Sequence, residues 1–291
     1  QVNPLTTVLT NFSVPLKTFG NAPFSLVNPS TNRPGTFTYT SSDTSVATID
    51  GNMVTIVKGG TSTITATQTG SNNYTSATIT FLFTVNRATP VLSNFVIPEK
   101  SFGDASFNLV APTTNSTGSF TYTSSNLSVA TIDDDIVTIV GGGISTITAV
   151  QASTTNYTSA TITASFQVSS LTTVLSNFVM PTKTLGNAPF AIVPPTTNSN
   201  GAFTYTSSNS SIATIAGNMV TIVGVGTATI TAVQAGTANY LSTTITALFV
   251  VNKGAPTISF TMPEKQTGMP NFVIDICSNS TGAFTYTSSN A

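Results

Sequence analysis

The sequence contains no histidine, no tryptophan and a single cysteine, and only 6% of its 291 residues are charged. Without histidine, neither a Ser-His-Asp triad nor a Cys-His pair can form, which excludes these two nucleophilic arrangements. One cysteine cannot make an internal disulfide, so we expect the fold to hold without that crosslink. The net charge of −1 provides no basic surface for phosphate groups, and we predict no nucleic-acid partner.

Long apolar runs are also missing. No stretch approaches the ~18 consecutive apolar residues of a membrane-spanning helix, so we predict no membrane span in this segment. No signal peptide is visible, and the chain begins with Gln1 rather than methionine. We therefore expect a processed N-terminus or a segment of a longer protein.

Hydroxyl groups take the place of charges. Threonine and serine account for 93 of the 291 residues, as 58 Thr and 35 Ser. Threonine is a strand former with a polar side that suits a sheet surface in water, whereas the helix formers Glu, Lys and Arg are scarce. The 40% apolar content is too high for a disordered chain. The composition predicts an all-β protein.

An internal repeat runs through the whole chain. The hexapeptide FTYTSS recurs in steps of 83, 83 and 81 residues, at Phe37, Phe120, Phe203 and Phe284. An Asn-Tyr pair recurs in steps of 83, at Tyr74, Tyr157 and Tyr240. Each unit has the size of a small domain. We predict four domains, at 1–86, 87–169, 170–252 and a partial one at 253–291. Because the junctions leave only two to four residues outside strands, we expect a semi-rigid row.

The third copy illustrates the predicted fold. In Ala228–Gln234 apolar and polar residues alternate, which is typical of a half-buried strand. Glycines at Gly51 and Gly217 suit tight hairpins, and PPTTNSNG suggests a longer loop. Seven strands are predicted: Thr173–Val179, Phe190–Val193, Ala202–Ser208, Ser211–Ile215, Met219–Val223, Ala228–Gln234 and Thr243–Val251. This number of short strands predicts tandem immunoglobulin-like β-sandwiches, three complete and one partial, in a row.

The segment Ser124–Ala149, SSNLSVATIDDDIVTIVGGGISTITA, resembles the signature of bacterial immunoglobulin-like domains of group 2, the intimin/invasin type. The same pattern begins again at Ser41 and Ser207. The resemblance covers the three complete copies and the first half of the fourth, and it implies extracellular stalks, adhesins, or phage and virus fibre proteins. The chain departs from the family by placing tyrosine where tryptophan is frequent, at Tyr39, Tyr122, Tyr205 and Tyr286. Either aromatic residue can serve in the core.

Acidic residues give no recurring site. Asp50 in the first copy corresponds to Asp133 in the second and Ala216 in the third, so we predict no catalytic residue, no cofactor and no enzymatic activity. The run Asp133–Asp135 could suggest calcium, which favours clustered carboxylates. Because the same turn is DGN or AGN in the other copies, we interpret it as a solvated hairpin tip and predict no metal site.

A lysine recurs in every copy, at Lys17, Lys100, Lys183 and Lys265. Some surface-filament domains crosslink such a lysine to an asparagine with the help of a buried acid. No acid recurs here, so we favour an exposed lysine that guards an edge strand. An intact-mass measurement tests the alternative, because the crosslink releases ammonia.

Three further features leave alternatives open. The recurring Tyr74, Tyr157 and Tyr240 could stack on a ligand, but we favour a buried ring with its hydroxyl tied to a loop. Cys277 could form an intermolecular disulfide, with a small buried thiol as the default. Asn-x-Ser/Thr sequons are no more frequent than chance predicts and are usable if the source glycosylates. They lie at Asn11, Asn73, Asn115, Asn126, Asn156, Asn209 and Asn279.

We predict a structural repeat protein of an extracellular stalk, filament or fibre, on a cell or virion surface, with other copies of itself as partners. The alternative is an adhesin or phage or virus fibre module that binds a host glycan or surface protein. The closing phrase GAFTYTSSNA, residues 282–291, is predicted as the third strand of the fourth domain. Three strands cannot cover their own apolar face, so we expect either a longer chain or completion by strands of a neighbouring copy.

Overall fold

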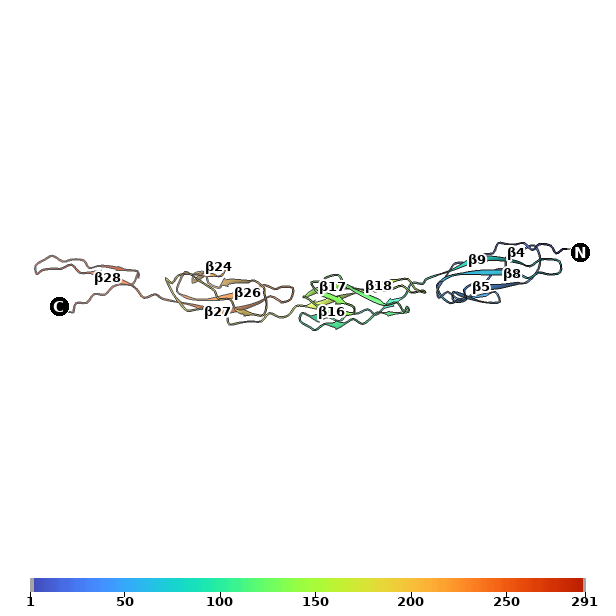
Figure 1. The fold of residues 1–291 in the computed structure, drawn as a ribbon. Helices are drawn as coiled ribbons and strands as arrows, with labels where there is room; N and C mark the ends of the chain where they lie inside the picture. Colours follow the sequence, from blue (N-terminus) through green and yellow to red (C-terminus); the bar gives the residue numbers. More distant parts are fainter. Residues whose placement is uncertain (1–2, 290–291) are drawn as a thin grey trace. The chain divides into compact units, whose positions relative to one another are not determined.

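The computed structural model describes residues 3–289, in which every regular element is a β-strand (Figure 1). Within this range no helix is long and apolar enough to cross a membrane. Contacts divide the chain into two compact units, Gln1–Ser170 and Leu171–Ala291, which are described separately below. Among residues 3–289, nine strands fall within each predicted complete domain and two fall within 253–289. We refer to these segments as repeats 1, 2 and 3 and the partial repeat; their precise boundaries stay a prediction.

Repeat 1 is a sandwich of short sheets. A four-stranded sheet has the order β2-β9-β8-β5, a three-stranded sheet has the order β3-β7-β6, and β1 pairs with β4. This is the division into two sheets expected of an immunoglobulin-like domain. The strands are β1 (Leu9–Thr10), β2 (Lys17–Thr18), β3 (Phe24–Ser25), β4 (Ser30–Thr31), β5 (Phe37–Ser41), β6 (Ala47–Asp50), β7 (Met53–Ile56), β8 (Gly60–Gln68) and β9 (Ala77–Asn86).

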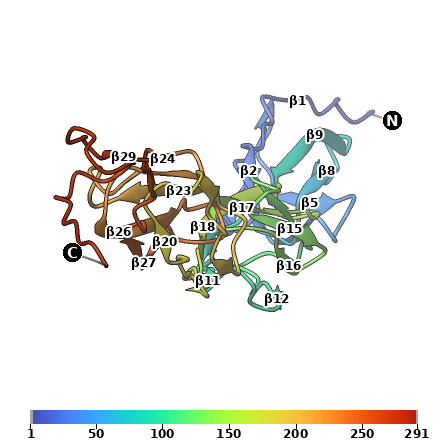
Figure 2. The same cartoon turned by 90° about the vertical axis from the view of Figure 1, so that its left-hand side faces the viewer.

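Repeats 2 and 3 have the same sheets in the same strand order. The strands of repeat 2 are β10 (Leu92–Ser93), β11 (Lys100–Ser101), β12 (Phe107–Asn108), β13 (Thr113–Thr114), β14 (Phe120–Ser124), β15 (Ala130–Asp133), β16 (Ile136–Ile139), β17 (Gly143–Gln151) and β18 (Ala160–Ser169). The strands of repeat 3 are β19 (Leu175–Ser176), β20 (Lys183–Thr184), β21 (Phe190–Ala191), β22 (Thr196–Thr197), β23 (Phe203–Ser207), β24 (Ala213–Ala216), β25 (Met219–Ile222), β26 (Gly226–Gln234) and β27 (Thr243–Asn252). In Figure 2 the labels of β26, β27 and β20 mark the larger sheet of repeat 3.

The core of each repeat lies between the two sheets. In repeat 1, Ile64, Ala66 and Phe83 are fully buried on the inner face of β8 and β9, and Val54 covers them from β7. The threonines between these residues lie on the other face, as the period of two predicts. The same inner positions are fully buried in the other repeats, at Ile147, Ala149, Phe166 and Val137, and at Ile230, Ala232, Phe249 and Val220.

A fully buried glutamine closes one end of each core. In repeat 2, Gln151 Oε1 accepts a hydrogen bond from the Thr114 hydroxyl at 2.8 Å, and Nε2 donates to the carbonyls of Ser116 and Gly118 at 3.1 and 2.9 Å. Gln68 and Gln234 occupy the same place and also accept from a threonine. A buried amide is tolerated here because its polar atoms are paired. None of the predictions from the sequence concerned this glutamine.

The predicted strands of repeat 3 are present, but the structure adds two. Thr196–Thr197, predicted as part of a loop, is the strand β22 and pairs with β19. Lys183–Thr184 forms β20, which runs parallel to the end of β27. Both have only two residues, too few to show a periodic pattern. The tight hairpins at Gly51 and Gly217 are confirmed, since both glycines have positive φ, 59° and 62°.

The partial repeat contains one hairpin, β28 (Ile258–Thr261) with β29 (Asp275–Ser278). The prediction of a third strand in the closing phrase is wrong for the residues that the structure describes: 282–289 form no strand, and Asn290 and Ala291 lie outside the described range. In the complete repeats the FTYTS strand pairs only with the long Thr-Ile-Thr-Ala strand, and 253–289 contain no such partner. Tyr286 is accordingly 57% exposed, whereas Tyr39 is 9% exposed.

Candidate functional site

The recurring Asn-Tyr pair of repeat 2 lies at the junction between repeats 1 and 2. The amide of Phe19 donates to the carbonyl of Asn86, the last residue of β9, at 2.8 Å. Two residues later, the amide of Ala88 donates to the carbonyl of Asn156 in repeat 2 at 2.9 Å. Arg87 is therefore the one residue between Asn86, which is hydrogen-bonded within repeat 1, and Ala88, which is hydrogen-bonded within repeat 2. The predicted linker of two to four residues is shortened by these main-chain bonds.

A main-chain bridge to the Asn-Tyr pair occurs at the start of each complete repeat. Leu5, Ala88 and Leu171 form parallel bridges to Tyr74, Tyr157 and Tyr240. In repeat 1, the amide of Leu5 donates to the carbonyl of Asn73 at 2.8 Å. In repeat 3, the amide of Leu171 donates to the carbonyl of Asn239 at 2.9 Å. The recurring Asn-Tyr pair thus anchors the first residues of its own repeat, a role that the sequence did not reveal.

Side chains add to this junction in the first unit. The ring of Tyr157 packs edge-to-face on Phe19, with ring centroids 5.5 Å apart and an interplanar angle of 78°. The amide of Gly59 donates to Asn156 Oδ1 at 3.0 Å. The prediction that these tyrosine rings are buried is only partly right, because Tyr74, Tyr157 and Tyr240 are half-buried. Tyr157 packs on the preceding repeat rather than within its own.

Gly59 is buried at this junction, and the absence of a side chain lets the backbone of repeat 2 approach it closely. A Cβ atom at position 59 would lie 2.5 Å from the carbonyl oxygen of Thr155. A contact that short with a backbone atom forces the two repeats apart. The corresponding residue of repeat 3 is Val225, which is 37% exposed.

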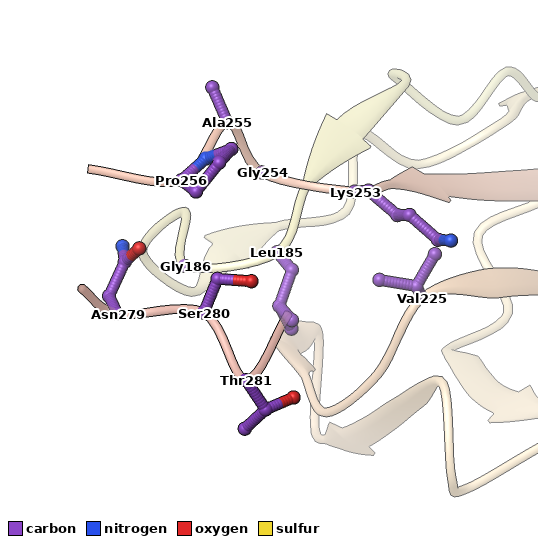
Figure 3. A pocket seen from close by; sticks show the side chains of 10 residues that line it. All are labelled: Leu185, Gly186, Val225, Lys253, Gly254, Ala255, Pro256, Asn279, Ser280 and Thr281. Carbon is purple, nitrogen blue, oxygen red and sulfur yellow. The ribbon is translucent and has the colours of Figure 1, made fainter. Parts of the chain in front are cut away.

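A pocket of about 490 Å³ lies beside Val225, where repeat 3 meets the partial repeat (Figure 3). Leu185 and Val225 line it from repeat 3, and Asn279, Ser280 and Thr281 face them from the partial repeat. Lys253 is the one ionisable residue among its lining residues. This set offers no acid-base pair, so the pocket has no evident catalytic arrangement.

The recurring lysines lie over aromatic rings. The distances from Nζ to the ring centroid are 4.7 Å for Lys17 and Phe24, 5.2 Å for Lys100 and Phe107, 4.8 Å for Lys183 and Phe190, and 5.6 Å for Lys265 and Phe272. Such cation–π contacts contribute about 0.5–1 kcal/mol at exposed sites. In the complete repeats the lysine lies on an edge strand, as predicted, but is half-buried. An intact-mass measurement tests the alternative, a lysine–asparagine crosslink, through the loss of ammonia.

The Asp133–Asp135 run forms the tip of the β15–β16 hairpin. Asp134 adopts a positive φ of 52°, the place taken by Gly51 in repeat 1, and Asp135 Oδ2 accepts from Asn108 Nδ2 at 3.1 Å. No group of three or more potential ligands that could hold a metal occurs among residues 3–289. The interpretation as a hairpin tip agrees with this placement.

The remaining candidates fall on the surface. Cys277 is exposed on β29, so the default of a buried thiol is wrong. Six of the seven sequon asparagines are exposed; the seventh, Asn156, is half-buried and accepts the Gly59 hydrogen bond. The tyrosines in place of the family's tryptophan pack in the complete cores, with Tyr39 stacked between Phe12 and Phe37 at 6.1 and 6.4 Å.

Few groups have perturbed acidity. Burial raises the pKa of the Tyr39 and Tyr205 hydroxyls, and burial followed by the charge of Asp135 raises the pKa of Tyr122. Hydrogen bonds from Ser45, first from its hydroxyl and then from its amide, lower the pKa of Asp43. Tyr39 and Tyr205 belong to the cores and Asp43 to a turn, whereas Tyr122 lines a pocket of about 290 Å³ together with Asp134 and Asp135.

Comparison with solved structures gives low similarity. Drosophila N-cadherin EC1-4 is 10% identical, with 84% of this chain and 75% of that chain covered and a TM-score of 0.29. The Sidekick-1 immunoglobulin domains 1–5 are 11% identical, with 88% and 62% covered and a TM-score of 0.33. BT4661, a SusE-like surface located polysaccharide binding protein from Bacteroides thetaiotaomicron, is 12% identical, with 84% and 54% covered and a TM-score of 0.23. Because these scores are low, the sandwich assignment rests on the strand pairing described above.

The search of curated proteins gave no match. The model of the bacterial Ig-like domain (group 2) matches residues 15–79 and 190–247, within the first and third repeats. Each span contains a Val-Ala-Thr-Ile or Ile-Ala-Thr-Ile segment, the hairpin and the long Thr-Ile-Thr-Ala strand, which are the parts of the sequence that carried the resemblance. The chain therefore carries bacterial Ig-like domains of group 2 at two positions, in tandem.

Proposed function

We propose that this chain is a structural segment of an extracellular stalk, filament or fibre, in which the repeats act as spacer and assembly units and no catalysis takes place. One observation supports it above the others. In each complete repeat the first strand of the larger sheet runs parallel to its last strand: β2 to β9, β11 to β18, and β20 to β27. Tension along the chain pulls these neighbours in opposite directions, so their hydrogen bonds are loaded together rather than opened one by one.

The short linkers support the same role. At the first junction only Arg87 separates the last residue hydrogen-bonded within repeat 1 from the first residue hydrogen-bonded within repeat 2. At the second, Ser169 accepts from the Phe102 amide within the first unit, and Leu171 donates to Asn239 within the second. Tension therefore passes from one sheet to the next with little free chain between them. Group 2 Ig-like domains are typical of bacterial surface proteins, which supports the extracellular placement.

Other copies of the chain are the proposed partners. A valine on the outer face recurs in all three repeats with high exposure, as Val27 (77%), Val110 (77%) and Val193 (75%). On a chain with few charges, contacts between copies desolvate few charged groups, and the recurring valine adds apolar surface to such contacts. Sedimentation of the chain over a wide concentration range tests this: growth of larger species is expected, and a monomer at every concentration contradicts it.

Single-molecule stretching of the chain tests the spacer role. Three unfolding events are expected, each releasing on the order of 250–300 Å, because 83 residues at roughly 3.6 Å each form one repeat. Leu185→Pro removes the amide that donates to the Asn252 carbonyl at 3.0 Å, so it should lower the unfolding force of repeat 3 alone. Leu185→Ala keeps the amide and serves as control. Unfolding without discrete events, or equal forces for both variants, would refute the proposal.

A further inference from the structure

The junction between repeats 1 and 2 combines a hydrogen bond from Gly59 to Asn156, a ring contact between Phe19 and Tyr157, and a close approach of the two backbones at Gly59. We propose that Phe19 and Gly59 form a docking surface that recognises the Asn156–Tyr157 loop of the following repeat. A glycine at position 59 then decides whether the two repeats move as one body. This inference concerns the junction alone and does not depend on the tension-bearing role proposed above.

The docking loop is organised by its own hydrogen bonds. The amide of Thr154 donates to the carbonyl of Tyr157 at 2.9 Å. The hydroxyl oxygen of Thr154 accepts from the amides of Asn156 and Tyr157 at 3.3 and 3.1 Å. Because the loop is held in this shape before it meets repeat 1, little conformational freedom is lost on docking.

Two contacts fix the position of the loop against repeat 1. Asn156 Oδ1 accepts the buried Gly59 amide at 3.0 Å, which would otherwise lack a partner there. The ring of Tyr157 meets Phe19 edge-to-face at 5.5 Å. The bond from the Ala88 amide to the Asn156 carbonyl lies within repeat 2, so it ties the start of that repeat to the loop without holding repeat 1. The Gly59 hydrogen bond and the ring contact together oppose rotation about Arg87.

The glycine requirement is steric. A Cβ atom at position 59 would stand 2.5 Å from the Thr155 carbonyl oxygen, and the loop cannot yield without breaking its internal bonds. Repeat 3 carries Leu185 in place of Phe19 and Val225 in place of Gly59. These side chains are 45% and 37% exposed and line the pocket of Figure 3. The end of repeat 3 thus lacks the docking surface, and the chain encodes two kinds of junction.

Distance measurements between spin labels test the docking. In a Cys277→Ser background of the full chain, labels at Thr48→Cys and Thr131→Cys report on repeats 1 and 2, since both threonines are exposed and lie outside the junction. A narrow distance distribution is expected for this parent. Gly59→Val, which copies repeat 3, should widen the distribution about twofold, because undocked neighbouring domains move independently. An equally narrow distribution for Gly59→Val would overturn the proposal.

A second pair of variants guards against misfolding. Asn156→Ala removes the acceptor of the Gly59 amide without adding bulk, and Asn73→Ala makes the same change in repeat 1, where the asparagine has no preceding repeat in the described chain. Asn156→Ala should widen the distribution and Asn73→Ala should not. Hydrogen exchange of the β8 and β17 amides should stay at the parent level in both. Equal distributions for the two variants would also overturn the proposal.

Discussion

The hydroxyl of Tyr39, a core residue of repeat 1, donates a hydrogen bond to Oδ1 of the exposed Asn28 at 2.7 Å. The corresponding Tyr205 of repeat 3 has Pro194 where repeat 1 has Asn28. Its hydroxyl oxygen is buried and has no hydrogen-bond partner within the described chain. The same aromatic position is therefore satisfied in one repeat and unsatisfied in another.

This difference predicts that replacing the tyrosine by phenylalanine has different effects on the stability of repeats 1 and 3. Tyr39→Phe should destabilise repeat 1 by about 1 kcal/mol, because it breaks a hydrogen bond, whereas Tyr205→Phe should leave repeat 3 unchanged or stabilise it by up to about 1 kcal/mol. Native-state hydrogen exchange of β8 and β26 measures each repeat separately. A comparable loss of stability in both variants would contradict the assignment of partners.

The buried glutamine predicts a large effect. Gln151→Leu should destabilise repeat 2 by about 3 kcal/mol, since it leaves the Thr114 hydroxyl, the buried Ser116 carbonyl and the half-buried Gly118 carbonyl without their partner. Exchange of the β17 amides would report the loss. Gln266→Leu, at an exposed position of the partial repeat, is the control and should change little. If both substitutions are equally mild, the hydrogen-bond network contributes less than its geometry implies.

The stability of the chain should be independent of pH between about 5 and 9, because the sequence has no histidine and the shifted groups titrate outside that range. The pKa of Asp43 is lowered, so its contribution is complete above its unfolded pKa and is lost as the pH falls through the folded pKa. The pKa of Tyr39 is raised, so its contribution is complete below the unfolded value of 10.0 and is lost as the pH rises through the folded value.

Denaturant titrations from pH 2 to 11 measure this profile. Asp43→Asn provides the control, because Asn126 forms the same turn in repeat 2 by accepting from the Ser128 amide at 3.1 Å. In that variant the acid-side loss in repeat 1 should become smaller. A steep change in stability near pH 7 would show that a group other than these controls the fold.

The hairpin tip of repeat 2 predicts a stabilising change. Asp134 has a positive φ, which is unfavourable for a residue with a side chain, so Asp134→Gly should stabilise repeat 2 by about 1 kcal/mol. The reverse change, Gly217→Asp, should destabilise repeat 3 by a similar amount. Exchange of the β16 and β25 amides provides the readout. A loss of stability in Asp134→Gly would indicate that the Asp134 carboxylate has a binding role.

The strands with strong alternation were the most predictable part of the fold. Ala228–Gln234 was predicted from its period of two and lies within β26. The two-residue strand β20 was missed because its pairing with β27 depends on residues nearly 70 positions away. The phrase FTYTSS shows the limit of local reading: the same letters form β23 but no strand after Phe284, because a strand requires a partner.

The junction was predictable only in part. The recurrence of the Asn-Tyr pair singles out Tyr157, whereas no pattern described in the sequence singles out Gly59. Their meeting could not be predicted, because nearly 100 residues separate Gly59 from Asn156 and they belong to different repeats. The exchange of Gly59 for Val225 in an otherwise similar repeat was the available signal.

Repeat 1 contains both partners of such a junction, with Phe19 and Gly59 at one end and the Asn73–Tyr74 pair at the other. A gene duplication that copies one such unit would therefore supply a matching junction at the moment the copy arises, and no compensating mutation would be needed. Substitutions of the kind seen at Val225 would later remove the match at a chosen boundary. The length of such a protein and the placement of its flexible points could then evolve independently of each other.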